Sequence, residues 1–270
     1  MLGKKLLATC SILTLMFGMS SIAQDVPAPV LYFDASDNPA HPNAWTNLGT
    51  AGGEVERVGN VRLEPARGGE PARYTTTGRS TVFNSEDGDP TVHLEDWTIE
   101  MYCKNNGPKF GDEEQLFAIS AIPMQLVQAI RAWIDSDWIV VGNGRTGLII
   151  KGKDTGQETV PSNTSNMEIG QKEWHWIVMV YNDGDRTFEG YLDGELVDEK
   201  KTNQKFDPKL DMPIVRIFAG DGIGRNFNGS VSIFRVYDQA LSAEQISPNF
   251  RAVEPTSKLA ITWGRVKTRS

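Results

Sequence analysis

The sequence predicts an all-β fold, a sandwich of two antiparallel sheets, from three observations. Apolar and aromatic residues form runs of strand length, such as 97–103 and 174–181, and no apolar pattern of helical period lasts three turns beyond the first 23 residues. Turn sequences separate these runs, including residues 182–185 and the pair Asp193-Gly194, which is typical of two-residue hairpins. A chain of 270 residues is also long enough for one large sandwich core.

Three segments that follow each other in a fixed order resemble one protein family. Residues 174–181 are WHWIVMVY, residues 190–197 are GYLDGELV, and residues 227–246 are FNGSVSIFRVYDQALSAEQI. They are similar to a WHxVxVxY strand, an LYVDGxLV hairpin and an FxGxIxxxRIYxxALSxxEI segment. This succession is similar to that of the laminin-G-like, concanavalin A-like lectin and glucanase jelly rolls. The opening residues 31–49 are also similar to bacterial members, and the strand 97–103 is similar to the family's FTIExWV strand. The resemblance implies a jelly roll of two antiparallel sheets.

The first 23 residues predict a cleaved secretory signal peptide. Lys4-Lys5 supply a positive start, residues 6–19 a short apolar run, and residues 21–23 a small-x-small cleavage site after Ala23. The alternative, a membrane anchor, needs about 20 apolar residues, and this run is shorter. A lipoprotein signal around Cys10 is not expected. We therefore expect a secreted or periplasmic, extracellular protein with no transmembrane segment after cleavage.

The remaining chain divides into a single sandwich domain at 24–252 and a basic tail at 253–270. The tail departs from the strand pattern and places four cations around an apolar patch at 259–264: Lys258, Arg265, Lys267 and Arg269. A loosely docked terminus and a sorting or docking signal are both compatible with this composition.

The strands are expected in order along the domain. The first covers 30–37, and residues 54–84 should be mostly loop, with short strands only at 73–74 and 81–83. The polar residues 154–166 are a further expected loop, and residues 241–246, opened by Ser242, form at most one helical turn. The other expected strands besides the hairpins above are 97–103, 116–122, 129–134, 138–141 and 148–150.

Charge and cysteine content narrow the classes of function. A net charge of −8 and a pI near 5.0 argue against a nucleic-acid partner, which would call for a basic face. The acidity fits either ordinary solubility or carboxylates available to Ca²⁺. Cys103 is the one cysteine left after cleavage, so the domain has no internal disulfide, and we expect a buried thiol there.

No catalytic constellation is convincing. A glycosidase needs two carboxylates at a set separation, and the nearest set, Glu189, Asp193 and Glu195, is divided by the expected Asp193-Gly194 turn. His175 matches a structural position in the resemblance rather than an acid or base. The glycine-rich residues 220–224 lack a following helix to receive a phosphate. We therefore expect a protein that is not an enzyme, with a glycoside hydrolase as the less favoured alternative.

The resemblance also implies a calcium site at one rim of the sandwich. Related sandwiches hold Ca²⁺ through Asp and Asn side chains and loop carbonyls, and oxygen ligands are what this ion requires. The candidates follow the expected first strand and precede the last one: Asp34, Asp37, Asp221, Asn226 and Asn228. These loops converge if the first and last strands are neighbours. The alternative is that the residues only form turns.

Carbohydrate binding calls for an exposed aromatic ring that stacks on a sugar. Trp45 and Trp138 lie near turn residues and are the expected exposed rings. Trp174 and Trp176 share one strand face, which belongs either to the core or to a ligand-binding sheet. Packing is the competing role for all four.

Together these features predict a secreted, non-catalytic binding module. Its expected partner is a glycan, with or without assistance from Ca²⁺. A structural or adhesive module that binds an extracellular protein is the alternative, and loss of partner binding on deletion of 253–270 would favour it.

Overall fold

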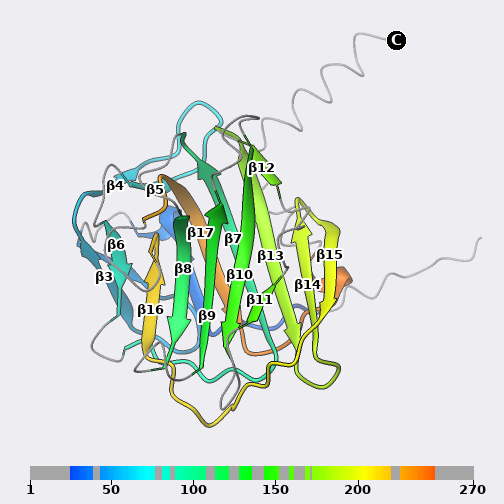
Figure 1. The fold of residues 1–270 in the computed structure, drawn as a ribbon. Helices are drawn as coiled ribbons and strands as arrows, with labels where there is room; N and C mark the ends of the chain where they lie inside the picture. Colours follow the sequence, from blue (N-terminus) through cyan, green and yellow to red (C-terminus); the bar gives the residue numbers. More distant parts are fainter. Residues whose placement is uncertain are drawn as a thin grey trace, which may run out of the picture.

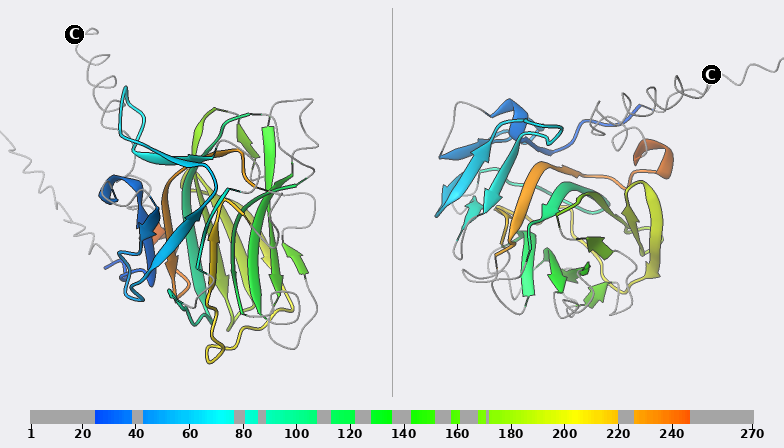
Figure 2. Two further views of the ribbon diagram at one scale, coloured as in Figure 1. Left: turned by 90° about the vertical axis from the view of Figure 1, so that its left-hand side faces the viewer. Right: turned by 90° about the horizontal axis from the view of Figure 1, so that it is seen from above.

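The computed structural model describes residues 25–38, 43–76, 81–85, 89–107, 113–121, 128–135, 143–151, 158–160, 168–170, 172–219 and 226–246. These residues form two antiparallel sheets that face each other across one apolar core (Figures 1 and 2). The predicted sandwich is therefore confirmed. The predicted signal peptide and the basic tail lie outside the described residues.

Sheet A has eight strands in the order β15-β14-β13-β7-β17-β5-β4, and β1 also pairs with β17. First and last strands are thus neighbours, as expected. The bounds are β1 Leu31–Asp34, β4 Val61–Glu64, β5 Arg73–Thr76, β7 Trp97–Asn105, β13 Trp174–Asn182, β14 Thr187–Leu192, β15 Glu195–Lys201 and β17 Gly229–Tyr237.

Sheet B has nine strands in the order β11-β10-β9-β8-β16-β6-β3-β2, and β12 also pairs with β10. A 3₁₀ turn, η1 (Ala35–Asp37), leads from β1 toward this sheet's first strand. The bounds are β2 Ala44–Thr46, β3 Glu54–Val58, β6 Val82–Asn84, β8 Glu113–Ser120, β9 Ala129–Asp135, β10 Asn143–Lys151, β11 Glu158–Val160, β12 Glu168–Gly170 and β16 Ile214–Ile217.

The β14–β15 hairpin has the turn that the sequence predicts. Asp193 and Gly194 have φ angles of 51° and 87°, and positive values at both central residues suit the right-handed twist of a two-residue hairpin. The Asp193 carboxylate accepts hydrogen bonds from the backbone N–H of Trp176 (2.9 Å) and from Nδ1 of His175 (2.9 Å). The turn is therefore fastened to β13 by its first residue.

The core lies between the sheets because inward-facing side chains alternate along each strand. Trp97 stacks on Tyr181 with ring centroids 5.5 Å apart, and Phe206 meets both rings. Each large apolar side chain that is fully buried contributes roughly 1.5–3 kcal/mol. Cys103 is buried in the same layer, as expected.

The outer face of sheet A carries a second apolar cluster, from Trp176 and Val180 to Tyr237. The helical turn predicted within 241–246 is present at residues 243–246, and this segment covers the cluster with Leu241 and Ile246. Within this layer the fully buried Glu100 carboxylate lies 3.4 Å from Nη1 of Arg235 and accepts a hydrogen bond from the Tyr237 hydroxyl. Because the buried Glu100 carboxylate is paired with Arg235, it avoids the large desolvation penalty of an isolated buried charge.

Two predictions about loops are wrong. Residues 54–84 were expected to be mostly loop, yet β3 and β4 lie there in addition to the short strands β5 and β6. The expected loop 154–166 contains β11. The expected strand at 138–141 lies outside the described residues, while the other predicted strands are present with shifts of a few residues at their ends.

Candidate functional site

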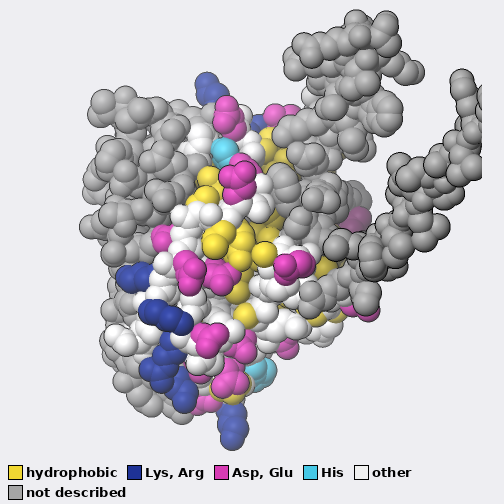
Figure 3. Space-filling model, turned by 90° about the vertical axis from the view of Figure 1, so that its right-hand side faces the viewer, with side chains coloured by type: hydrophobic (Ala, Val, Ile, Leu, Met, Phe, Trp, Pro, Cys, Tyr) yellow, Lys and Arg dark blue, Asp and Glu magenta, His cyan; other side chains and the backbone are white. Residues whose placement is uncertain are grey.

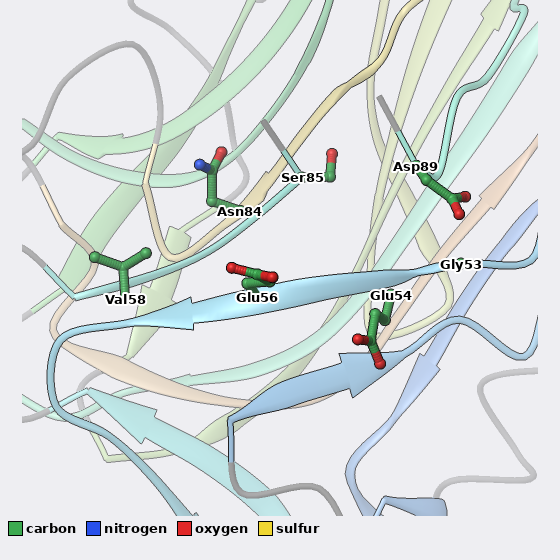
Figure 4. Close-up of a pocket in the computed structure, with 7 residues that line it drawn as sticks. All are labelled: Gly53, Glu54, Glu56, Val58, Asn84, Ser85 and Asp89. Carbon is green, nitrogen blue, oxygen red and sulfur yellow. The ribbon is translucent and has the colours of Figure 1, made fainter. Parts of the chain in front are cut away.

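A polar pocket of about 610 Å³ lies on the outer face of sheet B, against β3 and the end of β6 (Figure 4). Three of its lining residues carry carboxylates, and an amide, a hydroxyl, a glycine and one apolar side chain complete the lining. These residues are Gly53, Glu54, Glu56, Val58, Asn84, Ser85 and Asp89. Oxygen-rich lining suits a polar ligand with many hydroxyl groups.

Strand β3 places two carboxylates side by side through its alternation. Val55 is fully buried in the core, so Glu54 and Glu56 point to the opposite, solvent side, followed by Val58. Two residues on one face of a strand are about 7 Å apart. The Glu-Val-Glu sequence therefore gives a pair of exposed carboxylates directed into the pocket.

Asn84 forms the neighbouring wall and is held in one orientation. It lies opposite Glu56 in the β3–β6 pairing and opposite Arg216 in the β6–β16 pairing. Nε of Arg216 donates a hydrogen bond of 3.0 Å to Oδ1 of Asn84. Since the carbonyl oxygen of the amide is used in this way, Nδ2 remains as the donor on the pocket side. The Ser85 hydroxyl, in contrast, bonds to the backbone of Pro213 and Val215.

Asp89 closes the pocket at its other end, beside Gly53 (Figure 4). A Cβ atom on residue 53 would overlap the Asp89 carboxylate, and Gly53 has a φ of 78° that favours glycine. The glycine therefore allows the carboxylate to approach the start of β3. Asp89 is exposed and faces the same space as Glu54 and Glu56.

The chemistry available here is hydrogen bonding to a polar ligand. Within the part of the chain that the structure describes, no hydrogen bond or ion pair joins the carboxylates of Glu54, Glu56 or Asp89 to another residue. Carboxylates accept hydrogen bonds from hydroxyl and amine groups, and the Asn84 amide donates one. Among those same described residues, no group of three or more His, Cys, Asp or Glu side chains could hold a metal ion.

The described tryptophans that were expected to bind ligand do not line this pocket. Trp45 was expected to be exposed, and this is wrong: it is 0% exposed and packs between the rings of Phe33, Tyr74 and Phe83. Edge strand β2 is short, yet it turns this ring into the core. Trp138 lies outside the described residues.

Trp174 and Trp176 lie on the outer face of sheet A, away from the pocket. Trp176 is fully buried under the cluster described above, so it is closed to a ligand. Trp174 is partly buried, its ring is tilted against that of Tyr102 with centroids 4.8 Å apart, and its Nε1 donates a hydrogen bond of 2.7 Å to Glu70. Lys104 lies over its ring and also bonds Glu70. These contacts give Trp174 a packing role.

The calcium candidates do not come together as a set. Asp34 lies opposite Ile233 in β17, five residues from Asn228, which is about 17 Å along a strand. Its carboxylate accepts hydrogen bonds from Tyr32 and Ser36. The Asn226 amide is fully buried and donates to the carbonyl of Thr81. Ca²⁺ ligands lie 2.3–2.6 Å from the ion, so Asp34 and Asn228 cannot share one.

The other two calcium candidates add no shared site in the described chain. Asp37 is exposed at the end of η1. Asp221 lies outside the described residues. The described members therefore do not fit a common calcium site.

His175 has a structural role. Its Nδ1 lies 2.9 Å from Asp193, and its Nε2 accepts a hydrogen bond of 3.1 Å from the backbone N–H of Gly170. The ring therefore links the β14–β15 turn to β12. Both nitrogens are engaged in fixing strands, which agrees with the expectation from the sequence.

Sequence reasoning missed the pocket. The available signal was the alternation Glu54-Val55-Glu56-Arg57-Val58, which has the period of a half-buried strand. Its polar composition and the surrounding glycines led instead to the prediction of a loop.

The chain belongs to the family described as the concanavalin A-like lectin/glucanases superfamily, through its Laminin_G_3 member, which matches residues 77–247. No curated protein matches the chain in sequence. Within the described residues, no helix is both long enough and apolar enough to cross a membrane.

Solved structures with a similar fold include binding domains of botulinum neurotoxins. The serotype D ligand binding domain in complex with N-acetylneuraminic acid has a TM-score of 0.59 and 14% identity, covering 84% of this chain and 51% of that one. The neurotoxin DC binding domain in complex with rat synaptotagmin II has a TM-score of 0.56 and 13% identity, covering 83% and 51%. This chain spans about half the length of these domains, and the likeness concerns the fold.

Proposed function

We propose that this protein is a secreted, non-catalytic module that binds carbohydrate in the pocket on the outer face of sheet B. The observation that supports it is the set of carboxylates of Glu54, Glu56 and Asp89 around the fixed amide of Asn84. Carboxylate and amide groups are those that orient sugar hydroxyls, and Val58, 42% exposed, offers an apolar contact for a sugar C–H face. The botulinum domain with bound N-acetylneuraminic acid has a similar fold and is compatible with this proposal.

Binding without catalysis is the form of function that this pocket favours. The two carboxylates of β3 are adjacent on one face, yet both are exposed. The general acid of a glycosidase lies in a water-poor environment that keeps it protonated. Glycoside hydrolysis is therefore the weaker proposal, and a release assay on any bound glycan tests it directly.

A glycan array with the purified chain tests the proposed function. We expect saccharide binding that Asp89→Ala weakens at least about tenfold, the loss typical of a charged hydrogen bond. Glu195→Ala, at an exposed position of sheet A, is the matched control and should leave binding unchanged. No bound saccharide on the array, or equal binding by both variants, would refute the assignment.

Calcium assistance remains a proposal that draws on Asp37 and on Asp221. The same array, run with EDTA and with millimolar Ca²⁺, tests it. A thermal shift with Ca²⁺ that Asp221→Ala abolishes would support the site, because a ligand of the native state raises its stability.

A protein-binding or adhesive role is the second candidate, and one observation favours it. Leu196 is 51% exposed and lies opposite Tyr191 on the outer face of sheet A. A groove of about 390 Å³ runs past Tyr191, Val180 and Leu241. Figure 3, which views the molecule from the side of β14 and β15, shows apolar side chains with acidic groups beside them. Leu196→Asp should abolish binding of a protein partner here and leave saccharide binding unchanged.

A further inference from the structure

The charge of the sheet B pocket is unbalanced, and this imbalance restricts its ligand. Three carboxylates, Glu54, Glu56 and Asp89, line the pocket, and the described cation next to it is Arg216, behind Asn84. We infer that the ligand is an amino sugar, a saccharide that carries a primary ammonium group beside a hydroxyl. This inference rests on the proposed function and specifies its class of ligand.

The β3 carboxylates have the spacing of an ammonium site. Glu54 and Glu56 are about 7 Å apart along the strand and point to one side of it. An ammonium group has three N–H donors in a tetrahedral arrangement, so two hydrogen bonds of about 2.8 Å place their carboxylate oxygens roughly 4.6 Å apart. The flexible side chains of Glu54 and Glu56 can bring one oxygen each to that separation. One ammonium group can therefore contact both.

Asn84 is the second, independent observation. The residue is 9% exposed, and its Oδ1 accepts a hydrogen bond from Arg216. Asn84 lines the pocket, and its Nδ2 has no hydrogen-bond acceptor among the described residues. This amide donor is available to an acceptor atom of a ligand in the pocket, such as a sugar hydroxyl oxygen. A cation alone cannot supply one.

The positions of the donor and acceptors match neighbouring groups of one sugar ring. Asn84 lies directly opposite Glu56, and such cross-strand pairs have Cβ atoms about 5 Å apart. An ammonium group at Glu56 thus leaves the adjacent hydroxyl oxygen within reach of Nδ2 of Asn84. The apolar Val58 on the same strand face can contact the C–H side of the ring.

Three oligosaccharides of equal length and linkage test the inference, because they differ only at the second ring carbon. Glucosamine, N-acetylglucosamine and glucose oligomers carry an ammonium, an acetamide and a hydroxyl group there. By titration calorimetry at low salt, we expect the glucosamine oligomer to bind at least about tenfold more tightly than the other two. Its affinity alone should fall steeply when NaCl is raised, since salt screens the charges.

Isosteric Glu→Gln variants test whether the negative charges of the β3 glutamates bind the ammonium group. Glu54→Gln and Glu56→Gln should each reduce glucosamine-oligomer affinity by about tenfold, with little change for the glucose oligomer. Glu195→Gln, on the exposed edge of sheet A, should change neither. Circular dichroism melts of all three variants show whether the fold is retained.

The outcomes separate the inference from the proposed function. Equal affinity for the three oligomers, still weakened by Asp89→Ala, would refute the amino sugar and retain saccharide binding. Tight binding of a lysine oligomer without any saccharide would refute both. Preference for the glucosamine oligomer that both glutamine variants abolish would establish the ammonium site.

Discussion

Asp193 shows how one residue can set a local structure by conformation and by bonding. Its positive φ forms the hairpin turn with Gly194, while its carboxylate holds the backbone N–H of Trp176 and the His175 ring. Asp tolerates this conformation better than most residues, because its short polar side chain bonds locally. The turn was predictable from the two letters Asp-Gly, whereas the link to His175 depends on pairing between β13 and β14.

We expect Asp193→Ala to destabilise the protein by about 1–3 kcal/mol. The change removes two hydrogen bonds, leaves the N–H of Trp176 without this acceptor and places alanine at a positive φ. Urea unfolding monitored by tryptophan fluorescence measures the loss. Asp185→Ala, in the exposed turn before β14, is the control and should cost little; equal losses would contradict the role given to Asp193.

At the scale of elements, the β4–β5 hairpin is fastened across the outer face of sheet A by Glu70. Its Oε2 accepts hydrogen bonds from Lys104 on β7 and from Trp174 on β13. Burial alone would raise the pKa of this carboxyl. The hydrogen bonds from Lys104 and Trp174 and the positive charges of Lys104 and Arg73 outweigh the effect of burial, so the pKa lies below its usual 4.5. The hairpin is therefore held more strongly when Glu70 is ionised.

This contact predicts a pH dependence that Glu70→Gln removes. Because the pKa is lower in the folded state, the stabilisation is fully present above pH about 4.5 and is lost as the pH falls through the folded-state pKa. We expect the wild-type advantage to be about 1 kcal/mol or less at neutral pH, since solvent screens a partly exposed pair. Denaturant unfolding between pH about 3 and 7 measures it, and a gap that widens on acidification would contradict the assignment.

The short helical turn after β17 is an element that completes the outer layer of sheet A. The side-chain Oε1 of Gln245 accepts a hydrogen bond of 2.9 Å from the Ser242 N–H, as in a capping box. This cap starts the turn, and Leu241 and Ile246 pack on Trp176 and its neighbours. The sequence ALSAEQI predicted the turn, but it did not indicate that the turn covers a second buried cluster.

Leu241→Ala should destabilise the protein by about 2–4 kcal/mol, because it opens a cavity in that cluster. Thermal and urea unfolding measure the change. Leu48→Ala, at a position 46% exposed, should change stability by less than about 0.5 kcal/mol. A loss at Leu241 as small as that at Leu48 would mean that the outer layer does not contribute to stability.

At the scale of the whole molecule, the sandwich encloses its one described thiol. Burial raises the pKa of the Cys103 thiol, so the reactive thiolate is suppressed in the folded state. In a Cys10→Ser chain, we expect a thiol reagent to label Cys103 only in denaturant. Labelling at the same rate in native buffer would show that the core opens readily.

The sequence predicted the sheets better than the pocket, and the reason is physical. Segments 174–201 and 229–246 combine apolar strands with local turn signals, so residues adjacent in the sequence are enough to predict their secondary structure. The pocket instead joins β3 to β6 and the Asp89 segment through pairings between residues about thirty positions apart. Trp45 was misjudged for the same reason, since its burial comes from Phe33, Tyr74 and Phe83, which are distant in sequence.

The pairing of β1 with β17 also determines where the two ends of the described chain lie relative to the pocket. The described chain begins and ends on the same layer, where the Gln245 side chain donates a hydrogen bond to the carbonyl of Asp25 (Figure 2). The carboxylate pocket is on the opposite layer, sheet B. A tether joined at residue 25 or residue 246 would thus attach to the sheet A layer, so immobilisation at either point should preserve ligand access to sheet B.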